Sequence, residues 1–326
     1  MISKTLIIIA LKGTFLYFLD ANITLFLYDK IFVNESKLHS NFHQKKIWIT
    51  GASSGIGLEL AHRLASQGAI LVLSARNENK LQSLAKEFQS LYDNHDTMIV
   101  PFDMRANPQT LETTIDKILH QMGGIDILIL NAGYFQEGSS LLTTPQLRND
   151  IMQVNYYSPV HLAMELIHRD QWKTKKKGHI VVTSSAYGFV PAPYSAAYSA
   201  TKHAINGFFH VLRVESTSWN LKITLACPGP IQTNIHHVSN KAKNVQHGGG
   251  SVYQNNPFNL SVERCVQLML SGMVGPSFFF TELWILKNLG VIYLYLHHYI
   301  PVLGNFASSL ISKITAMYHD EELNLW

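Results

Sequence analysis

A short apolar run that leads directly into a glycine-rich turn, followed by a helical pattern, constrains the fold of this chain most strongly. Ile47–Thr50 precedes Gly51-Ala52-Ser53-Ser54-Gly55-Ile56-Gly57, and Leu58–Ser66 follows with helical spacing. Glycines permit a tight turn and let backbone amides approach a pyrophosphate, while the N-terminus of the next helix adds partial positive charge. In this strand-turn-helix context, the turn is predicted to bind a dinucleotide through Gly51, Ser53, Ser54, Gly55, Ile56 and Gly57.

Further apolar runs alternate with longer helical stretches along the chain. Each run is brief and continuous, as expected for strands that are buried on both faces of a sheet. Alternating strands and crossover helices predict an α/β fold with a Rossmann-type, doubly wound parallel sheet. We expect a single catalytic domain over residues 45–281 of the 326. The predicted strands are Ile47–Thr50, Ile70–Ser74, Met98–Phe102, Ile125–Leu130, His179–Ser184 and Lys222–Ala226.

Arg76 stands at the end of the second run, in Ser74-Ala75-Arg76-Asn77. An enzyme that uses NAD usually places Asp or Glu here to bind the ribose 2′-hydroxyl. A guanidinium instead offers forked donors to a 2′-phosphate. The predicted cofactor is therefore NADP(H), with a surface arginine at a helix start as the alternative interpretation.

Three other strand ends complete the predicted cofactor site. Asp103 follows the third run beside Met104, and its carboxylate can accept a hydrogen bond from an adenine amino group or, alternatively, cap a helix. Asn131-Ala132-Gly133 follows the fourth run, where small residues let the backbone lie along the adenosine ribose. The segment after the sixth run is expected to approach the nicotinamide carboxamide through Pro228, Gly229, Ile231 and Thr233.

Tyr198 and Lys202 carry the most specific chemical signal. They are four residues apart, so a helix places them on one face. A phenol titrates near ~10, but a nearby ammonium and a positively charged nicotinamide both favour phenolate. Tyr198 can then exchange a proton with a substrate oxygen near neutral pH. Lys202 is also expected to bind the hydroxyls of the nicotinamide ribose.

Two polar residues upstream complete the predicted catalytic group of Asn155, Ser185, Tyr198 and Lys202. Ser185 lies thirteen residues before Tyr198, at the end of a predicted strand, and its hydroxyl is expected to bind the substrate oxygen. Asn155 lies in the preceding helical stretch and is predicted to hold a water that links Lys202 to solvent.

Composition excludes several other kinds of site. The net charge of +4 is too small to indicate a nucleic-acid partner. The chain has only two cysteines, without a Cys-x-x-Cys pair, and its histidines lack ligand spacing, so no metal is expected. Cys227 is interpreted as a buried strand residue, because no base is indicated beside it.

Both ends of the chain are unusually apolar. Charged residues make up 15% of the sequence, below the roughly 25% of typical soluble domains. Residues 1–40 are predicted to associate with a membrane, with a buried extra helix as the alternative, although Lys12, Asp20 and Asp29 interrupt the segment. Residues 282–326 form an aromatic, apolar extension, interpreted as a membrane contact, a substrate lid or ordinary packing. The segment 236–257, with three glycines at 248–250, is expected to be a substrate loop.

These motifs together resemble the short-chain dehydrogenase/reductase family over roughly residues 45–281. The resemblance rests on the glycine turn, Asn131-Ala132-Gly133, Asn155, Ser185, Tyr198 to Lys202 and Pro228-Gly229. One departure is Leu130, where the family usually has a first Asn before Asn131. Within the family the chain looks like the member 7 branch. That likeness implies the endoplasmic-reticulum membrane, lipophilic carbonyl or alcohol substrates such as steroids or retinoids, and by analogy a homodimer.

The leading hypothesis is thus an NADP(H)-dependent oxidoreductase that interconverts a hydroxyl and a carbonyl. A catalytically silent, membrane-bound NADP(H)-binding scaffold is the main alternative, although a pure binder has no need of Tyr198. An epimerase or dehydratase of the same family is a third possibility, but it would require a further acid or base that the sequence does not identify.

Overall fold

The computed structural model describes residues 20–170, 172–233 and 259–319. A parallel sheet of seven strands, in the order β3-β2-β1-β4-β5-β6-β7, runs through the centre of this part of the chain. The sheet confirms the predicted doubly wound α/β fold. The strands are β1 Lys46–Thr50, β2 Ile70–Ser74, β3 Thr97–Ile99, β4 Ile127–Leu130, β5 His179–Thr183, β6 Lys222–Pro228 and β7 Glu282–Ile285.

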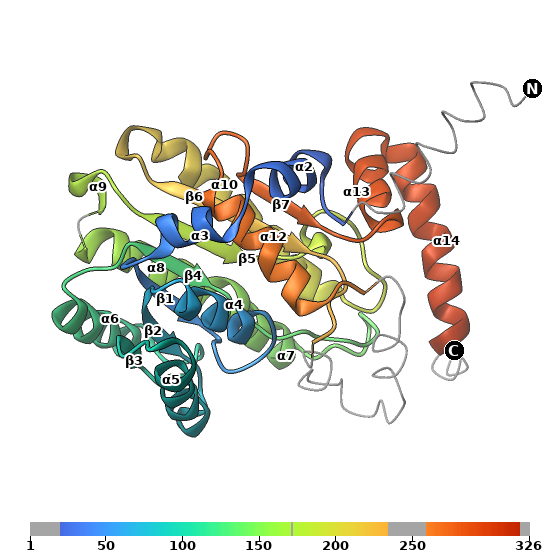
Figure 1. The fold of residues 1–326 in the computed structure, drawn as a ribbon. Coiled ribbons are helices and arrows are strands. Elements are labelled where there is room, and N and C mark those ends of the chain that lie inside the picture. Colours follow the sequence, from blue (N-terminus) through green and yellow to red (C-terminus); the bar gives the residue numbers. More distant parts are fainter. Residues whose placement is uncertain (1–19, 171, 234–258, 320–326) are drawn as a thin grey trace, which may run out of the picture.

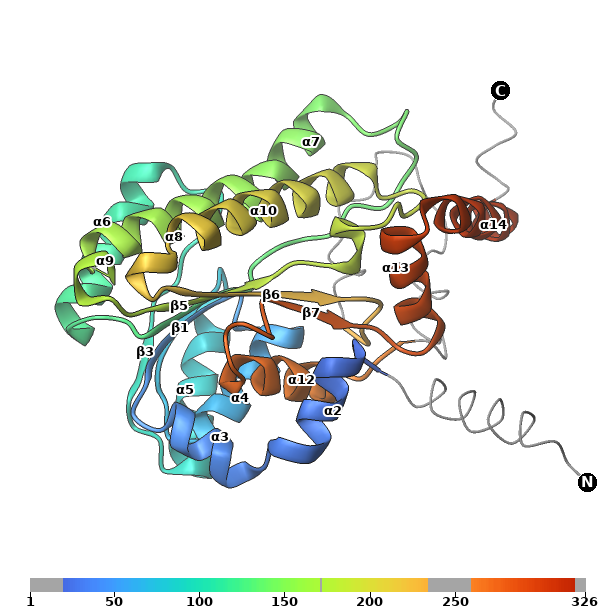
Figure 2. The ribbon, with the colours of Figure 1, turned by 90° about the horizontal axis from the view of Figure 1, so that it is seen from above.

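Helices cover both faces of the sheet (Figures 1 and 2). In Figure 2, α6, α7, α8 and α10 lie on one face, while α3, α4, α5 and α12 lie on the other. The central strands are buried on both sides, which is why their sequences are continuously apolar rather than alternating. The helices are α2 Ile23–Phe32, α3 Glu35–Phe42, α4 Gly55–Ser66, α5 Glu78–Tyr92, α6 Pro108–Met122, α7 Pro145–Met152, α8 Ser158–Arg169, α9 Trp172–Lys175, α10 Ala196–Glu215, α12 Val262–Val274, α13 Leu289–Tyr299 and α14 Pro301–His319.

The strand order reverses between β1 and β4. β1 pairs with β2 on one side and with β4 on the other, so the connections after these strands leave in opposite directions. In open α/β sheets, ligands bind in the crevice outside the carboxyl ends of the strands at such a switch point. The fold therefore places a candidate site at the turns that follow β1 and β4.

Several strand boundaries differ from the prediction by one to three residues, and one strand was missed. β3 ends at Ile99 rather than Phe102, because Pro101 has no N–H to donate to the neighbouring strand. The backbone N–H groups of Val100 and Phe102 still donate to the carbonyl oxygens of Leu73 and Ala75. β7 was not predicted, and it pairs with β6 beyond the expected boundary at residue 281.

An ion-paired cluster joins the N-terminal helix α2 to α12. The Asp29 carboxylate is 5% exposed and accepts hydrogen bonds from Arg264, Gln267 and Ser271 of α12. Arg264 also donates to Asp20. α2 is thus attached to the catalytic domain through its buried side chains, Leu25 and Asp29, and the association of residues 1–40 with a membrane stays a prediction. The more apolar residues 1–19 and the expected substrate loop at 236–257 lie outside the described residues.

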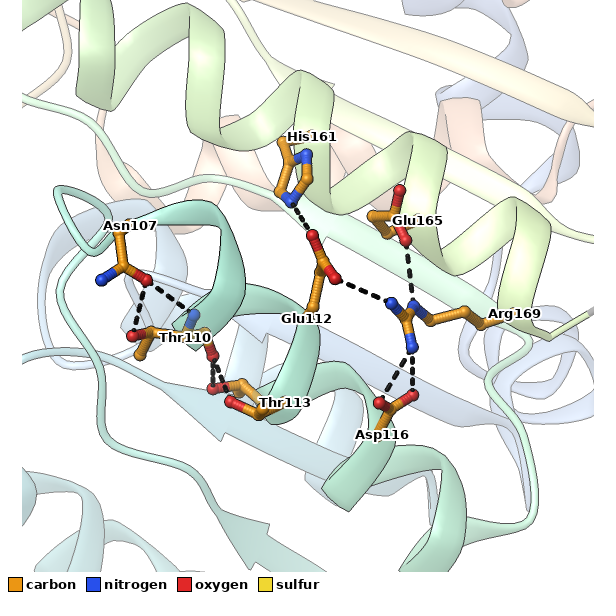
Figure 3. Close-up of polar contacts among 9 residues, drawn as sticks. Asn107, Thr110, Glu112, Thr113, Asp116, His161, Glu165 and Arg169 are labelled. Carbon is orange, nitrogen blue, oxygen red and sulfur yellow. Dashed lines mark hydrogen bonds and ion pairs between the residues drawn. The ribbon is translucent and has the colours of Figure 1, made fainter.

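On the other face of the sheet, a cluster of charged side chains joins α6 to α8 (Figure 3). Arg169 of α8 binds Glu112 and Asp116 of α6, at 3.0 and 2.7 Å, and Glu165 of its own helix at 2.9 Å. His161 lies 3.7 Å from Glu112. These ion pairs connect α6 to α8, but because their side chains are partly exposed, each contributes little to the free energy of unfolding.

Two helices in sequence, α13 and α14, form the C-terminal extension, and they follow β7 directly. α13 ends at Tyr299, and Pro301 begins α14, a position where the missing N–H of proline costs nothing. No helix among the described residues is both long and apolar enough to cross a bilayer.

Candidate active site

A cavity of about 650 Å³ opens at the carboxyl ends of the strands, where the turns after β1 and β4 meet. It brings together most of the residues predicted from the sequence. Gly57 and Asn155 do not line the cavity. They lie behind its wall and position residues that do line it, Gly57 by close packing and Asn155 by hydrogen bonds. The predicted residues that do line it are Gly51, Ser53, Ser54, Gly55, Ile56, Arg76, Asp103, Met104, Asn131, Ala132, Gly133, Ser185, Tyr198, Lys202, Pro228, Gly229, Ile231 and Thr233.

The glycines after β1 are required by the backbone and by close packing. Gly51 and Gly55 have φ angles of +70° and +55°, in the left-handed region that other residues avoid. A Cβ on Gly57 would lie 2.3 Å from the Gly51 carbonyl oxygen and 2.4 Å from Asn131 Nδ2. Gly57 therefore lets the start of α4 approach the turn, whose residues line the cavity.

Asn131 acts as a bracket between the two central turns. Its Nδ2 donates to the carbonyl oxygens of Thr50 and Gly51, at 3.2 and 3.4 Å. The Thr50 hydroxyl in turn accepts from the backbone N–H groups of Asn131 and Ala132. The side chain of Asn131 is thus used to hold the glycine turn, while the backbone of 131–133 remains for the predicted contact with a ribose.

Positive charge gathers at the end of β2. Arg76 is exposed there, and Lys80 in the first turn of α5 and Arg105 also line the cavity. Arg105 donates to both oxygens of Asp103, with a shortest distance of 2.7 Å. These hydrogen bonds, with a further contribution from the charge of Arg76, hold the pKa of Asp103 below its ordinary value. The sequence analysis missed Lys80 and Arg105, although Lys80 lies only four residues after Arg76.

Tyr198, Ser185 and Lys202 meet at the inner end of the cavity. α10 carries Tyr198 and Lys202 on one face, as predicted, and Lys202 Nζ lies 5.4 Å from the centre of the Tyr198 ring. Lys202 Nζ donates to the Thr183 carbonyl oxygen at 2.8 Å. The Ser185 hydroxyl donates to the Pro228 carbonyl oxygen at 3.3 Å and lies near enough to Tyr198 to lower the pKa of that phenol. Residues that are separated in the sequence thus lie together at one end of the cavity, as predicted for Ser185, Tyr198 and Lys202.

Burial opposes the ionisation of both Tyr198 and Lys202. It raises the pKa of Tyr198, against a smaller lowering by the hydrogen bond with Ser185, and Tyr187 raises it further. Burial also lowers the pKa of Lys202 to about 8. Desolvation therefore determines the direction of this shift in the protein alone, and the lowering expected from the ammonium together with a positively charged nicotinamide stays a prediction.

Asn155 lies in a π-helical turn, Gln153–Tyr157, between α7 and α8. Its side chain is 2% exposed and accepts from Tyr134 N–H, while its Nδ2 donates to Tyr134 O and Thr201 Oγ1, all at 3.1 Å. Thr201 precedes Lys202, so Asn155 ties the loop after β4 to α10. The predicted role of holding a water that links Lys202 to solvent stays a prediction.

Aromatic side chains that the sequence analysis did not select form the wall beside Tyr198. Phe135 lies edge-on to the Tyr198 ring at 4.8 Å, and Tyr187 does so at 6.2 Å. Burial raises the pKa of Tyr187 to about 12, so this phenol stays neutral. The Tyr187 N–H donates to Ser185 Oγ at 3.2 Å, which fixes this wall relative to Ser185.

The loop after β6 closes the far side of the cavity. The Gly229 N–H donates to the Ile285 carbonyl oxygen of β7 at 2.9 Å, so the unpredicted seventh strand supports this loop. Cys227 is buried in β6, and burial raises the pKa of its thiol, which agrees with its interpretation as a strand residue.

A parallel sheet with a glycine turn after its first central strand and a buried tyrosine-lysine pair defines a Rossmann-type oxidoreductase. Residues 45–244 match the family model described as short chain dehydrogenase. The chain belongs to this family, the short-chain dehydrogenases/reductases, and is an oxidoreductase.

Its similarities within the family fall in the member 7 branch. It is 32% identical to "Dehydrogenase/reductase SDR family member 7" of Homo sapiens over 271 residues, which are 82% of this chain and 77% of that protein. It is 39% identical to "Dehydrogenase/reductase SDR family member 7B" of Mus musculus over 189 residues, 57% of this chain and 58% of that protein. The predicted family and branch are thus confirmed.

Solved structures share the fold. A short-chain dehydrogenase from Sphingobium yanoikuyae in complex with NADPH has a TM-score of 0.61 and 25% identity, covering 70% of this chain and 84% of that one. A short-chain dehydrogenase/reductase from Burkholderia phymatum in complex with NAD has a TM-score of 0.68 and 21% identity, covering 80% and 95%.

Proposed function

We propose that this chain is an NADP(H)-dependent oxidoreductase that interconverts a hydroxyl and a carbonyl on a lipophilic substrate, with Tyr198 as the acid and base. The observation that carries the proposal is the joined group of Tyr198, Ser185 and Lys202 at the inner end of a cavity that begins at the glycine turn.

The cavity fits a dinucleotide by the shape of its backbone. A Cβ at Gly51 would lie 2.9 Å from Ala132 Cα, and a Cβ at Gly57 would collide with Gly51. The turn after β1 can therefore adopt this conformation only because both positions lack a side chain. Gly51, Ser53, Ser54, Gly55 and Ile56 would hold the pyrophosphate, and Lys202 would hold the nicotinamide ribose. When bound, the nicotinamide supplies or accepts the hydride.

The protein's own residues handle the proton. In the reducing direction, the Tyr198 hydroxyl donates its proton to the substrate oxygen as that oxygen gains negative charge. Ser185 lies within hydrogen-bond reach of Tyr198 and can bind the same oxygen. The oxidising direction reverses the transfer, and Tyr198 accepts the proton from the hydroxyl.

The preference for NADP(H) over NAD(H) rests on charge. Arg76, Lys80 and Arg105 line the adenosine end of the cavity, and Asp103, the carboxylate that faces them, is bound by Arg105. An added 2′-phosphate would meet net positive charge and forked donors there.

The preference for lipophilic compounds such as steroids or retinoids rests on the aromatic wall of Phe135 and Tyr187 and on the likeness to the member 7 branch. Aromatic rings bind flat apolar substrates well because they bury a large area.

We also propose residence in the endoplasmic-reticulum membrane and pairing into a homodimer. The apolar sequence of residues 1–19 supports membrane residence, and cell fractionation with a carbonate wash tests it.

The exposed side chains of Tyr157, beside α8, and of Val211 and Val214, on α10, support the homodimer. Light scattering of wild type beside Val214→Asp tests the dimer.

The activity test uses the full chain in nanodiscs with steroid, retinoid and simple aromatic carbonyls. NADPH and NADH are compared, with Tyr198→Phe beside the exposed control Tyr157→Phe. We expect NADPH-preferred turnover that is lost in Tyr198→Phe and kept in Tyr157→Phe. NADPH binding without turnover on any substrate, in either direction, would overturn the catalytic proposal in favour of the scaffold.

A further inference from the structure

Helix α14 presents a stripe of exposed apolar side chains. Val302, Phe306 and Leu310 are 79%, 71% and 53% exposed, and their spacing of four residues places them on one face of the helix. Ile300 at the α13–α14 corner is 48% exposed. Exposed apolar residues gathered in this way mark a surface that contacts a partner or a membrane.

The charge pattern around this stripe favours lipid. Residues 288–312 contain no Asp, Glu, Lys or Arg, and Lys287 and Lys313 stand at the two ends of that stretch. Lysines in such places can bury their apolar stems and keep the ammonium in the headgroup region. Tyr299, which is 67% exposed, adds an aromatic side chain of the kind enriched at that depth.

The N-terminal helix reaches the domain beside this hairpin (Figures 1 and 2). Asn22 N–H donates to Trp284 O at 2.9 Å, and Tyr295 of α13 lies near the backbone of Ile23, which lowers the pKa of its phenol against the effect of burial. α2 has its own exposed stripe at Ile23, Leu27 and Ile31, which are 42%, 41% and 64% exposed. The nineteen residues before Asp20 include the apolar runs at 6–11 and 15–19. The exposed stripe of α2 and the α13–α14 hairpin therefore lie in one region of the surface.

This region also adjoins the substrate side of the active site. Tyr293 of α13 donates to the Pro191 carbonyl oxygen at 3.4 Å and is hydrogen-bonded to Ser308 of α14 at 2.7 Å. Trp284 packs against Phe189 at 5.9 Å. Tyr187 lines the cavity and residues 189–191 follow it in the chain. α13 and β7 therefore contact the segment that leads away from the reacting groups, and α14 is joined to it through Tyr293.

We propose that the α13–α14 hairpin lies in the surface of a lipid bilayer and admits lipophilic substrate from the bilayer to the cavity. The part about substrate entry rests on the proposed function, and the part about the bilayer does not. The occupant of the apolar face is lipid rather than a second protein, because residues 288–312 carry no charged side chain, lysines stand at both ends of this stretch, and the exposed apolar stripe of α2 lies beside the hairpin.

A spin label tests the contact in the full chain. The two native cysteines, Cys227 and Cys265, are both 0% exposed, so a cysteine introduced at Phe306 takes the label alone. Leu91→Cys on α5, where the leucine is 60% exposed, is the matched control. In phosphatidylcholine nanodiscs, we expect oxygen to reach the label at 306 while a water-soluble nickel chelate is excluded, and the reverse at 91.

Equal access of the nickel chelate to both labels would overturn the proposal. Strong dipolar coupling between labels at 306 would also overturn it, because it would show that a second copy covers the face. Neither readout requires turnover, so each stands even if the proposed enzymatic activity fails.

The substrate route is tested with Phe306→Ser/Leu310→Ser. We expect the KM of a long-chain ketone that partitions into the bilayer to rise about tenfold at constant kcat, since two apolar contacts with lipid are lost. The KM of a small water-soluble ketone should not change. An equal rise in both KM values would refute entry from the bilayer.

Discussion

The Asp29 carboxylate provides a quantitative test of how α2 is held on the catalytic domain. It accepts hydrogen bonds from Arg264 at 2.6 Å, Ser271 at 2.7 Å and Gln267 at 3.0 Å, and its side chain is 4% exposed. Removing one partner of a buried ion pair costs ~3–5 kcal/mol, because the other charge loses its counter-ion. Arg264 is 20% exposed and keeps Asp20, so the lower end applies.

We therefore expect Asp29→Asn to lower the free energy of unfolding by about 3 kcal/mol and the Tm by roughly 4 °C, because the entropy of unfolding of a chain of this length is large. Thermal melting of the full chain in detergent measures the shift. Asp93→Asn is the control, because Asp93 is 95% exposed and its pairing with His95 is a surface contact. A Tm no lower than that of the control would refute the role of this cluster.

The pH dependence of this effect follows from the pKa of Asp29. Burial alone would raise that pKa, but the hydrogen bonds from Ser271, Arg264 and Gln267 together hold it below its ordinary value of 3.8. Because the folded-state pKa is the lower one, the stabilisation is fully present above the ordinary pKa and is lost as pH falls through the folded-state value. The Tm difference between wild type and Asp29→Asn should stay constant from neutral pH down to about 5 and shrink only in stronger acid. A difference that already disappears between neutral pH and about 5 would contradict this.

Three further substitutions test the site. Arg76→Glu should shift the ratio of NADPH to NADH affinity by about 10–100-fold toward NADH, measured by nucleotide fluorescence, because a charge-assisted contact is lost; an unchanged ratio would exclude Arg76 from the 2′-phosphate site. Gly57→Ala should abolish NADPH binding, since its Cβ would lie 2.3 Å from the Gly51 carbonyl, whereas Gly207→Ala, with nothing within 4 Å, should bind normally. Asn155→Ala should lower the free energy of unfolding by ~2 kcal/mol in denaturant melts, because buried donors and acceptors lose their partners. An unchanged stability would contradict the role of Asn155 in joining the loop after β4 to α10.

Local features of the sequence were sufficient to predict much of this fold. The glycine turn and the Tyr198–Lys202 pair each depend on only a few consecutive residues, and backbone conformation or helical spacing determines their geometry. The central strands were found because burial on both faces leaves them continuously apolar. In contrast, β7 begins with Glu282 and is only four residues long, so no pattern separated it from the aromatic segment that follows.

Contacts between distant parts of the chain were not readable from the sequence. Asp29 interrupts an apolar segment, and only its meeting with Arg264, 235 residues away, shows it as a buried partner. Arg105 and Tyr187 lack a motif of their own. Their positions in the cavity depend on how the loops after β3 and β5 turn, which local spacing does not determine.

The electrostatics of the reacting group suggest why its parts are buried together. In water, a phenol and an ammonium would interact weakly, since a high dielectric screens them. Within this site burial raises the pKa of Tyr198 and lowers that of Lys202 to about 8, so the protein by itself holds the tyrosine neutral. The same burial strengthens the effect of any positive charge placed beside the ring, because fewer solvent dipoles oppose it. Proton exchange at Tyr198 is therefore expected to respond strongly to the charge of what fills the cavity. Because both groups are buried, binding of a positively charged nicotinamide controls the reactivity of the phenol.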